Sequence, residues 1–209
     1  MTRAEVMELL DKLELSSYMN EYNVDNRIEE LGYRNLVRVC GGATKICLVF
    51  QDNTDFIVKW SYDCDDDNSE SIKECHIYAC AVDAGLGFLF PKTEIMGRWG
   101  GVTVIIQDKI DYSVEDCSYD KRQYYQKIAR TVTNRIFCKM EKGFRIGGCY
   151  YDRDLDTTWG KLVISLYGKQ ITKKLCKFIK EHKINDLHGA NIGYKNDKPI
   201  ILDFSGYYR

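Results

Sequence analysis

The sequence has few of the residues that build metal centres or hold a chain in a membrane. It contains three histidines, and its nine cysteines form no C-x-x-C pair, so neither a cluster of nitrogen ligands nor a zinc site is expected. Because the cysteines are odd in number and scattered, we expect reduced, buried thiols in a cytosolic protein. No apolar run approaches the length of a membrane span. The first thirty residues carry acidic side chains and predict no signal peptide.

An excess of charge of either sign is also lacking. Lysine and arginine number 30, aspartate and glutamate 31, and the net charge is −1, so the composition indicates neither a membrane nor a specific nucleic-acid partner. A helical pattern over about 159–182, with a break expected near Gly168, carries a lysine-rich face that is more typical of a solvated surface than of nucleic-acid binding. Repeats and Pro/Ser-rich linkers are absent, and the 209 residues are expected to form one domain.

Three polar residues are present in a spacing that indicates chemistry. Asp186 is followed five residues later by Asn191 and twelve residues after that by Asp203, which stands behind an apolar run that predicts a strand. This pattern suits phosphoryl transfer, because the first Asp can accept the proton of an attacking hydroxyl while the Asn and the second Asp hold Mg²⁺. From the residues alone, a loop of Asx turns whose carboxylates cap the backbone remains an alternative.

The segment DLHGAN at 186–191 resembles the catalytic loop of the protein-kinase-like superfamily, and DFS at 203–205 resembles its metal-binding DFG element. The loop is nearest to aminoglycoside phosphotransferases and lipopolysaccharide-core kinases. The segment LDFSGY at 202–207 is also similar to short kinase-like proteins encoded by bacteriophages. The resemblance implies an α+β, bilobal fold of the protein-kinase type.

The upstream chain can be divided accordingly. Residues 1–35 are predicted to form two helices, one with a capping box at Thr2 and Glu5 and one over 24–31. They are expected to brace the first lobe, with a partner-binding helix as the alternative. Apolar and β-branched runs then predict strands over 36–40, 45–50, 56–60, 87–96 and 102–107, with a helix over about 69–84.

This order resembles a kinase N-lobe. It implies an N-lobe over 36–107, with a five-stranded antiparallel sheet and an αC helix. A hinge over 108–112 and a reduced, mostly helical C-lobe over 113–209 would follow.

The resemblance also implies nucleotide-binding residues. A turn of Gly41, Gly42 and Ala43 resembles the loop that covers the phosphates, although by itself it is an ordinary hairpin turn. Lys59 on the third strand resembles the lysine that grips the α- and β-phosphates. Glu74 in the following helix resembles its ion-pair partner, and Glu70, one turn earlier, is the alternative. The adenine would be read by backbone groups of the hinge region, at Gln107, Asp108 and Lys109.

The activity implied is that of an ATP- and Mg²⁺-dependent phosphotransferase. Asp186 would align and deprotonate the acceptor, and Asn191 and Asp203 would hold the metal. A Ser or Thr of a protein is the expected acceptor, with a small molecule as the second choice. Ile184-Asn185 replaces the His-Arg of many protein kinases, and six residues after Asp203 leave no room for an activation loop. A pseudokinase that sequesters or scaffolds a partner is therefore the alternative, and AMP transfer to a protein is a weaker one.

Overall fold

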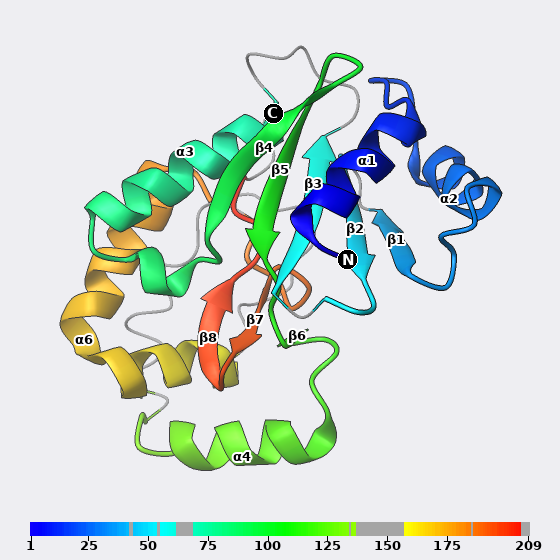
Figure 1. Cartoon of the computed structure of the whole chain (residues 1–209). Coiled ribbons are helices and arrows are strands. Elements are labelled where there is room, and N and C mark those ends of the chain that lie inside the picture. The colour runs from blue at the N-terminus through cyan, green and yellow to red at the C-terminus, as the bar shows by residue number, and fades with distance from the viewer. Residues whose placement is uncertain are drawn as a thin grey trace. The chain divides into compact units, whose positions relative to one another are not determined.

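The computed structural model (Figure 1) describes residues 1–41, 44–53, 55–61, 69–133, 135–136, 157–184 and 186–205. The protein is α+β, as predicted, and its backbone divides into two compact units. The first unit comprises Met1–His76 and Lys92–Lys109, and the second comprises Ile77–Pro91 and Ile110–Arg209. Each unit is described by itself. In the part of the chain so described, no helix is long and apolar enough to cross a membrane.

The first unit is built on a five-stranded antiparallel sheet in the order β1-β2-β3-β5-β4, which confirms the predicted sheet. Its strands are β1 (Val37–Gly41), β2 (Lys45–Phe50), β3 (Phe56–Ser61), β4 (Thr93–Trp99) and β5 (Val102–Asp108). Alternate side chains of a strand point to opposite faces of the sheet. One face is therefore apolar, with buried residues that include Leu48, Val58 and Val104.

Two N-terminal helices cover this apolar face. Helix α1 (Arg3–Leu13) begins with the predicted capping box of Thr2 and Glu5. Helix α2 (Glu21–Glu30) begins three residues earlier than predicted, because Asn20 caps it. Figure 1 shows both helices, in blue, beside β1 to β3, and their buried residues belong to the same apolar cluster as the sheet. The expectation that these helices brace the first unit is confirmed.

One predicted strand is wrong at its start. The strand expected over 87–96 is a 3₁₀ turn, η2 (Gly87–Leu89), followed by β4 from Thr93. The Phe90 amide donates to the Gly87 carbonyl and closes the turn. Pro91 lacks an N–H group and cannot extend a strand ladder from this point. Leu89 and Phe90 are buried in the core of the second unit instead.

The second unit contains a three-stranded sheet in the order β6-β7-β8 and mostly helical surroundings. The strands are β6 (Tyr112–Ser113), β7 (Ile192–Lys195) and β8 (Lys198–Ile201). The helices are α4 (Tyr119–Ala129), α6 (Thr157–Glu181) and the end of α3 (Glu70–Asp83), which begins in the first unit. The predicted break of α6 is present at Gly168, whose φ of 76° favours glycine. An apolar core that includes Trp159, Ile179 and Phe204 holds these elements together.

Candidate functional site

The face of the five-stranded sheet opposite α1 and α2 carries polar side chains. In the strand register Lys45 lies opposite Ser61, Cys47 opposite Lys59, and Ile57 opposite Gln107. Directly opposed residues of antiparallel strands share a face, and so do residues two positions apart. Lys45, Lys59 and Gln107 therefore point to the same side of the sheet, and all three are buried.

Glu74 of α3 meets these lysines. Its carboxylate is 0% exposed and accepts hydrogen bonds from Lys59 Nζ at 3.1 and 3.2 Å. The structure thus contains the ion pair that the sequence predicted. Gln107 supports it, because its Oε1 accepts from Lys59 Nζ at 3.3 Å while its Nε2 donates to Thr93 Oγ1 at 3.0 Å.

A second lysine joins the cluster, and sequence analysis did not identify it. Lys45 Nζ lies 2.9 Å from Glu74 Oε1 and 3.4 Å from Glu70 Oε2. Glu70, the alternative partner proposed for Lys59, therefore pairs with Lys45. The signal that could have found Lys45 is its strand position: once the β2–β3 register is known, Lys45 and Lys59 must share a face. Lys45, Lys59, Glu70 and Glu74 are called the lysine–glutamate cluster below.

The interior around this cluster strongly disfavours charge that lacks a partner. Burial raises the pKa of the neighbouring Cys47 thiol to about 12, and the positive charge of Lys59 offsets this only in part. Taking two ammonium groups and two carboxylates out of water costs several kcal/mol per ion unless good hydrogen bonds replace the lost water. The short contacts made by Glu74 are the compensation that the structure provides.

Of the three residues predicted to form the glycine turn, the structure describes only Gly41. Gly41 ends β1, and a β-carbon at this position would overlap the side chain of Glu21 at the start of α2. The absence of a side chain at Gly41 thus allows α2 to approach, a role that the sequence pattern did not indicate. Gly42 and Ala43 lie outside the described residues, as does Asn185.

The residues expected to read adenine have other partners. Gln107 and Asp108 are the last residues of β5, and the side chain of Gln107 accepts a hydrogen bond from Lys59. The amide of Asp108 donates to the Lys92 carbonyl, and that of Lys109 to the Asp55 carbonyl, both at 2.8 Å. These two N–H groups are therefore engaged by the protein itself. A base would have to be read by carbonyl groups here or by N–H groups elsewhere.

In the second unit, the β7–β8 hairpin positions two of the predicted site residues. Asn196 and Asp197 form its turn with φ of 51° and 59°, values that Asn and Asp tolerate better than most residues. Ile192 pairs with Ile201, and beyond this pair the Leu202 amide donates to the Asn191 carbonyl at 2.8 Å. Asn191 and the residue before Asp203 thus lie side by side at the open end of the hairpin.

Asn191 also binds Asp186. Its Nδ2 donates to the backbone carbonyl and to the Oδ2 of Asp186, each at 2.9 Å. This arrangement fixes the Asp186 carboxylate, whose side chain is 12% exposed. Because the amide nitrogen of Asn191 faces Asp186, its amide oxygen is the atom that could serve as a metal ligand. Asp203 Oδ1 accepts from Ser205 Oγ at 3.2 Å.

His188 is a further member of this group that sequence analysis did not assign. Its Nε2 lies 3.5 Å from Asp186 Oδ2, and its Nδ1 accepts from the Ala190 amide at 3.2 Å. The same Nε2 lies 3.2 Å from Asn191 Nδ2. The His188 ring therefore contacts both members of the Asp186–Asn191 hydrogen bond. The sequence signal that could have identified His188 is its position between Asp186 and Asn191 in the loop. Asp186, His188, Asn191 and Asp203 are called the aspartate cluster below.

The donor set of the aspartate cluster suits Mg²⁺, which takes one or two protein oxygens and completes its coordination with water or phosphate. Within the described ranges, no group of three or more His, Cys, Asp or Glu side chains could hold a metal ion. A tightly coordinated zinc or calcium centre is thus not found among these residues. The amide oxygen of Asn191 and the carboxylate of Asp203 would suit a metal ion whose other ligands come from a bound phosphate and water.

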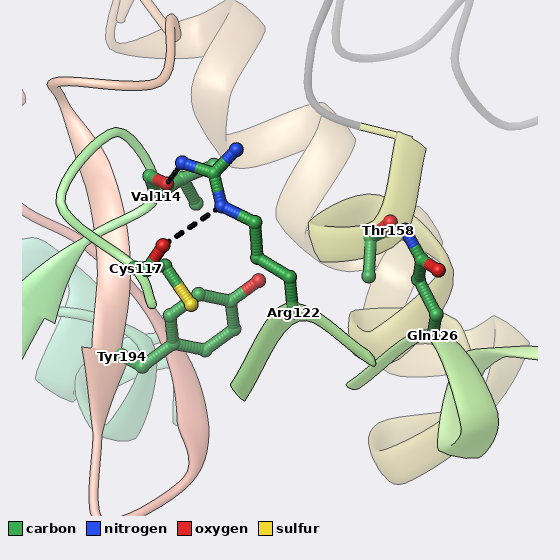
Figure 2. A pocket seen from close by; sticks show the side chains of 6 residues that line it. All are labelled: Val114, Cys117, Arg122, Gln126, Thr158 and Tyr194. Atoms are coloured by element: carbon green, nitrogen blue, oxygen red, sulfur yellow. Dashed lines mark hydrogen bonds between the residues drawn. The ribbon is translucent and has the colours of Figure 1, made fainter. Parts of the chain in front are cut away.

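A separate cavity of about 110 Å³ lies in the second unit (Figure 2). Its lining residues are Val114, Cys117, Arg122, Gln126, Thr158 and Tyr194. The Arg122 guanidinium donates to the carbonyls of Cys117 at 2.8 Å and Val114 at 3.1 Å, and so fixes the loop before α4. Ligand pockets commonly measure about 300–1,000 Å³, so this cavity has room for a few waters and not for a nucleotide. None of the predicted site residues lines it.

Comparison of the chain with models of known protein families finds no match, and comparison with curated proteins finds none either. The assignment of a function therefore depends on the residues and contacts described above.

Proposed function

We propose that the protein is an ATP- and Mg²⁺-dependent phosphotransferase of the protein-kinase-like fold that acts on a Ser or Thr of a protein. The observation that carries the proposal is the buried ion pair of Lys59 with Glu74. A buried pair is weak evidence for stability, because well-packed apolar residues often serve the fold equally well. Charged groups held in this way are more typical of functional sites.

In this proposal Lys59, oriented by Glu74, binds the α- and β-phosphates. The succession of elements supports the assignment, since the lysine lies on the third strand and the glutamate on the helix that follows it. Bound Mg²⁺ would neutralise charge on the phosphates, held by the amide oxygen of Asn191 and the carboxylate of Asp203.

Asp186 is proposed to align the acceptor hydroxyl and accept its proton. Its support is the pair of hydrogen bonds from Asn191, which hold one carboxylate oxygen, together with the nearby His188. A carboxylate that is already held in place loses little orientational freedom when the acceptor binds, and this favours catalysis by positioning.

A binding module without catalysis is the second candidate. The same Asn191 bond that orients Asp186 also satisfies one of its oxygens, as a purely structural loop would require. In that case the protein would bind a nucleotide or a partner protein and transfer nothing.

The deciding experiment incubates the purified protein with Mg²⁺ and a cell lysate that supplies candidate acceptor proteins, using γ-labelled ATP in one reaction and α-labelled ATP in another. Transfer of the γ-label alone supports the phosphotransferase, and transfer of the α-label indicates AMP transfer. Calorimetric titration with ATP is run beside both reactions. Binding without transfer of either label supports the pseudokinase, and absence of binding contradicts the nucleotide site altogether.

A further inference from the structure

Lys45 is the second buried lysine of the lysine–glutamate cluster, and the resemblance to kinases assigns it no role. Its Nζ lies 2.9 Å from Glu74 Oε1, and the same oxygen accepts from Lys59 Nζ at 3.2 Å. The two ammonium groups therefore converge on one oxygen atom. A single carboxylate cannot neutralise both of them.

Glu70 supplies the second negative charge, but its contact with Lys45 is the weaker one. The distance from Lys45 Nζ to Glu70 Oε2 is 3.4 Å, beyond the usual range for an N–H donor and an oxygen acceptor. The same Oε2 accepts a hydrogen bond of 2.6 Å from Thr44 Oγ1. Glu70 is also more exposed than Glu74, at 13% against 0% of the side chain. A stronger anion could therefore replace Glu70 beside Lys45 without disturbing the bond to Glu74.

We infer that Lys45 is a second phosphate ligand, which exchanges Glu70 for the β- or γ-phosphate of a bound nucleoside polyphosphate while Lys59 keeps its contact with Glu74. The inference rests on the proposed nucleotide binding and names further residues of the same site. Lys45 directly follows Thr44, at the point where the chain leaves the glycine turn and enters β2. A phosphate carries more charge and more acceptor oxygens than a carboxylate, so it is the better partner for an ammonium group.

The test is calorimetric titration of ATP and AMP, with Mg²⁺, into wild type, Glu70→Gln, Lys45→Met and the double variant Lys45→Met/Glu70→Gln. The double variant removes one charge of each sign, so the buried cluster keeps its net charge, and its melting temperature is measured as a check on folding. We expect the double variant to bind ATP at least about tenfold more weakly than Glu70→Gln does, the effect of losing one charge-assisted hydrogen bond. AMP, which has a single phosphate, should bind both equally well.

Glu70→Gln alone should bind ATP as tightly as wild type or more tightly, since a competing anion has been removed. Equal ATP affinity of Glu70→Gln and the folded double variant would overturn the inference. Loss of AMP and ATP affinity by the same factor would do so too, because a merely structural lysine affects both nucleotides alike. Weaker ATP binding by Glu70→Gln would contradict the exchange of partners. If wild type binds neither nucleotide, the proposed function fails and the inference with it.

Discussion

Replacement of Glu74 by glutamine tests the most unusual feature of the structure, a carboxylate with 0% exposure that holds two lysines. The substitution keeps the size of the side chain and removes its charge. Of the four residues of the lysine–glutamate cluster, Glu70 is then the one carboxylate that remains beside two ammonium groups, so the cluster carries a surplus positive charge. Removing one member of a buried pair costs about 3–5 kcal/mol.

For a domain of this size, each kcal/mol lowers the melting temperature by about 2–4 °C. We therefore expect Glu74→Gln to melt about 6–20 °C below wild type, measured by circular dichroism. The loss should fall in part when Lys45→Met is added, because that change removes the surplus positive charge.

Glu94→Gln is the matched control. Glu94 pairs with Arg3 at 2.8 Å on the surface, where the two side chains are 41% and 49% exposed. Exposed pairs contribute about 0–1 kcal/mol, so this variant should melt within a few degrees of wild type. The reasoning fails if Glu74→Gln is as stable as Glu94→Gln, since the buried carboxylate would then not be compensating the lysines.

Lys59→Ala should weaken Mg²⁺-ATP binding by about 1.5–3 kcal/mol, the usual value of a charge-assisted hydrogen bond; unchanged affinity in calorimetry would remove Lys59 from the site. Asp186→Asn should keep ATP affinity and lose about 10²–10⁴-fold in label transfer, whereas Asp203→Ala should lose both transfer and the magnesium dependence of binding. A well-folded Asp186→Asn protein with full activity would exclude the enzyme. All nine cysteines should titrate as free thiols in denatured, unreduced protein, and a shortfall would reveal a disulfide or a metal. The pKa of Cys47 is raised from 9.0 to about 12, so between pH 9 and 12 the unfolded chain loses the thiol proton while the folded protein keeps it. The contribution of the protonated thiol to the free energy of unfolding is therefore complete below pH 9 and is lost between pH 9 and 12. Cys47→Ala should make the fall of the unfolding free energy in that window less steep.

The local sequence determined the elements whose signals are local. The Thr2–Glu5 capping box starts α1, and Gly168 breaks α6, because capping hydrogen bonds and a left-handed φ depend on few neighbours. Apolar and β-branched runs predicted the strands of the five-stranded sheet for the same reason. The exception at 87–90 shows the limit, since burial of Leu89 and Phe90 in the second unit competes there with strand propensity.

The candidate residues were found by spacing, but their partners were decided by the tertiary structure. Glu70 and Glu74 are one helical turn apart, and the sequence favoured Glu74 as the partner of Lys59 with Glu70 as the alternative. The placement of α3 against the sheet assigns Glu74 to both lysines and Glu70 to Lys45. Lys45 gave no local signal, because a lysine on a strand is ordinarily solvated. Its burial follows from the register of β2 with β3, and register is set by contacts between residues far apart in the chain.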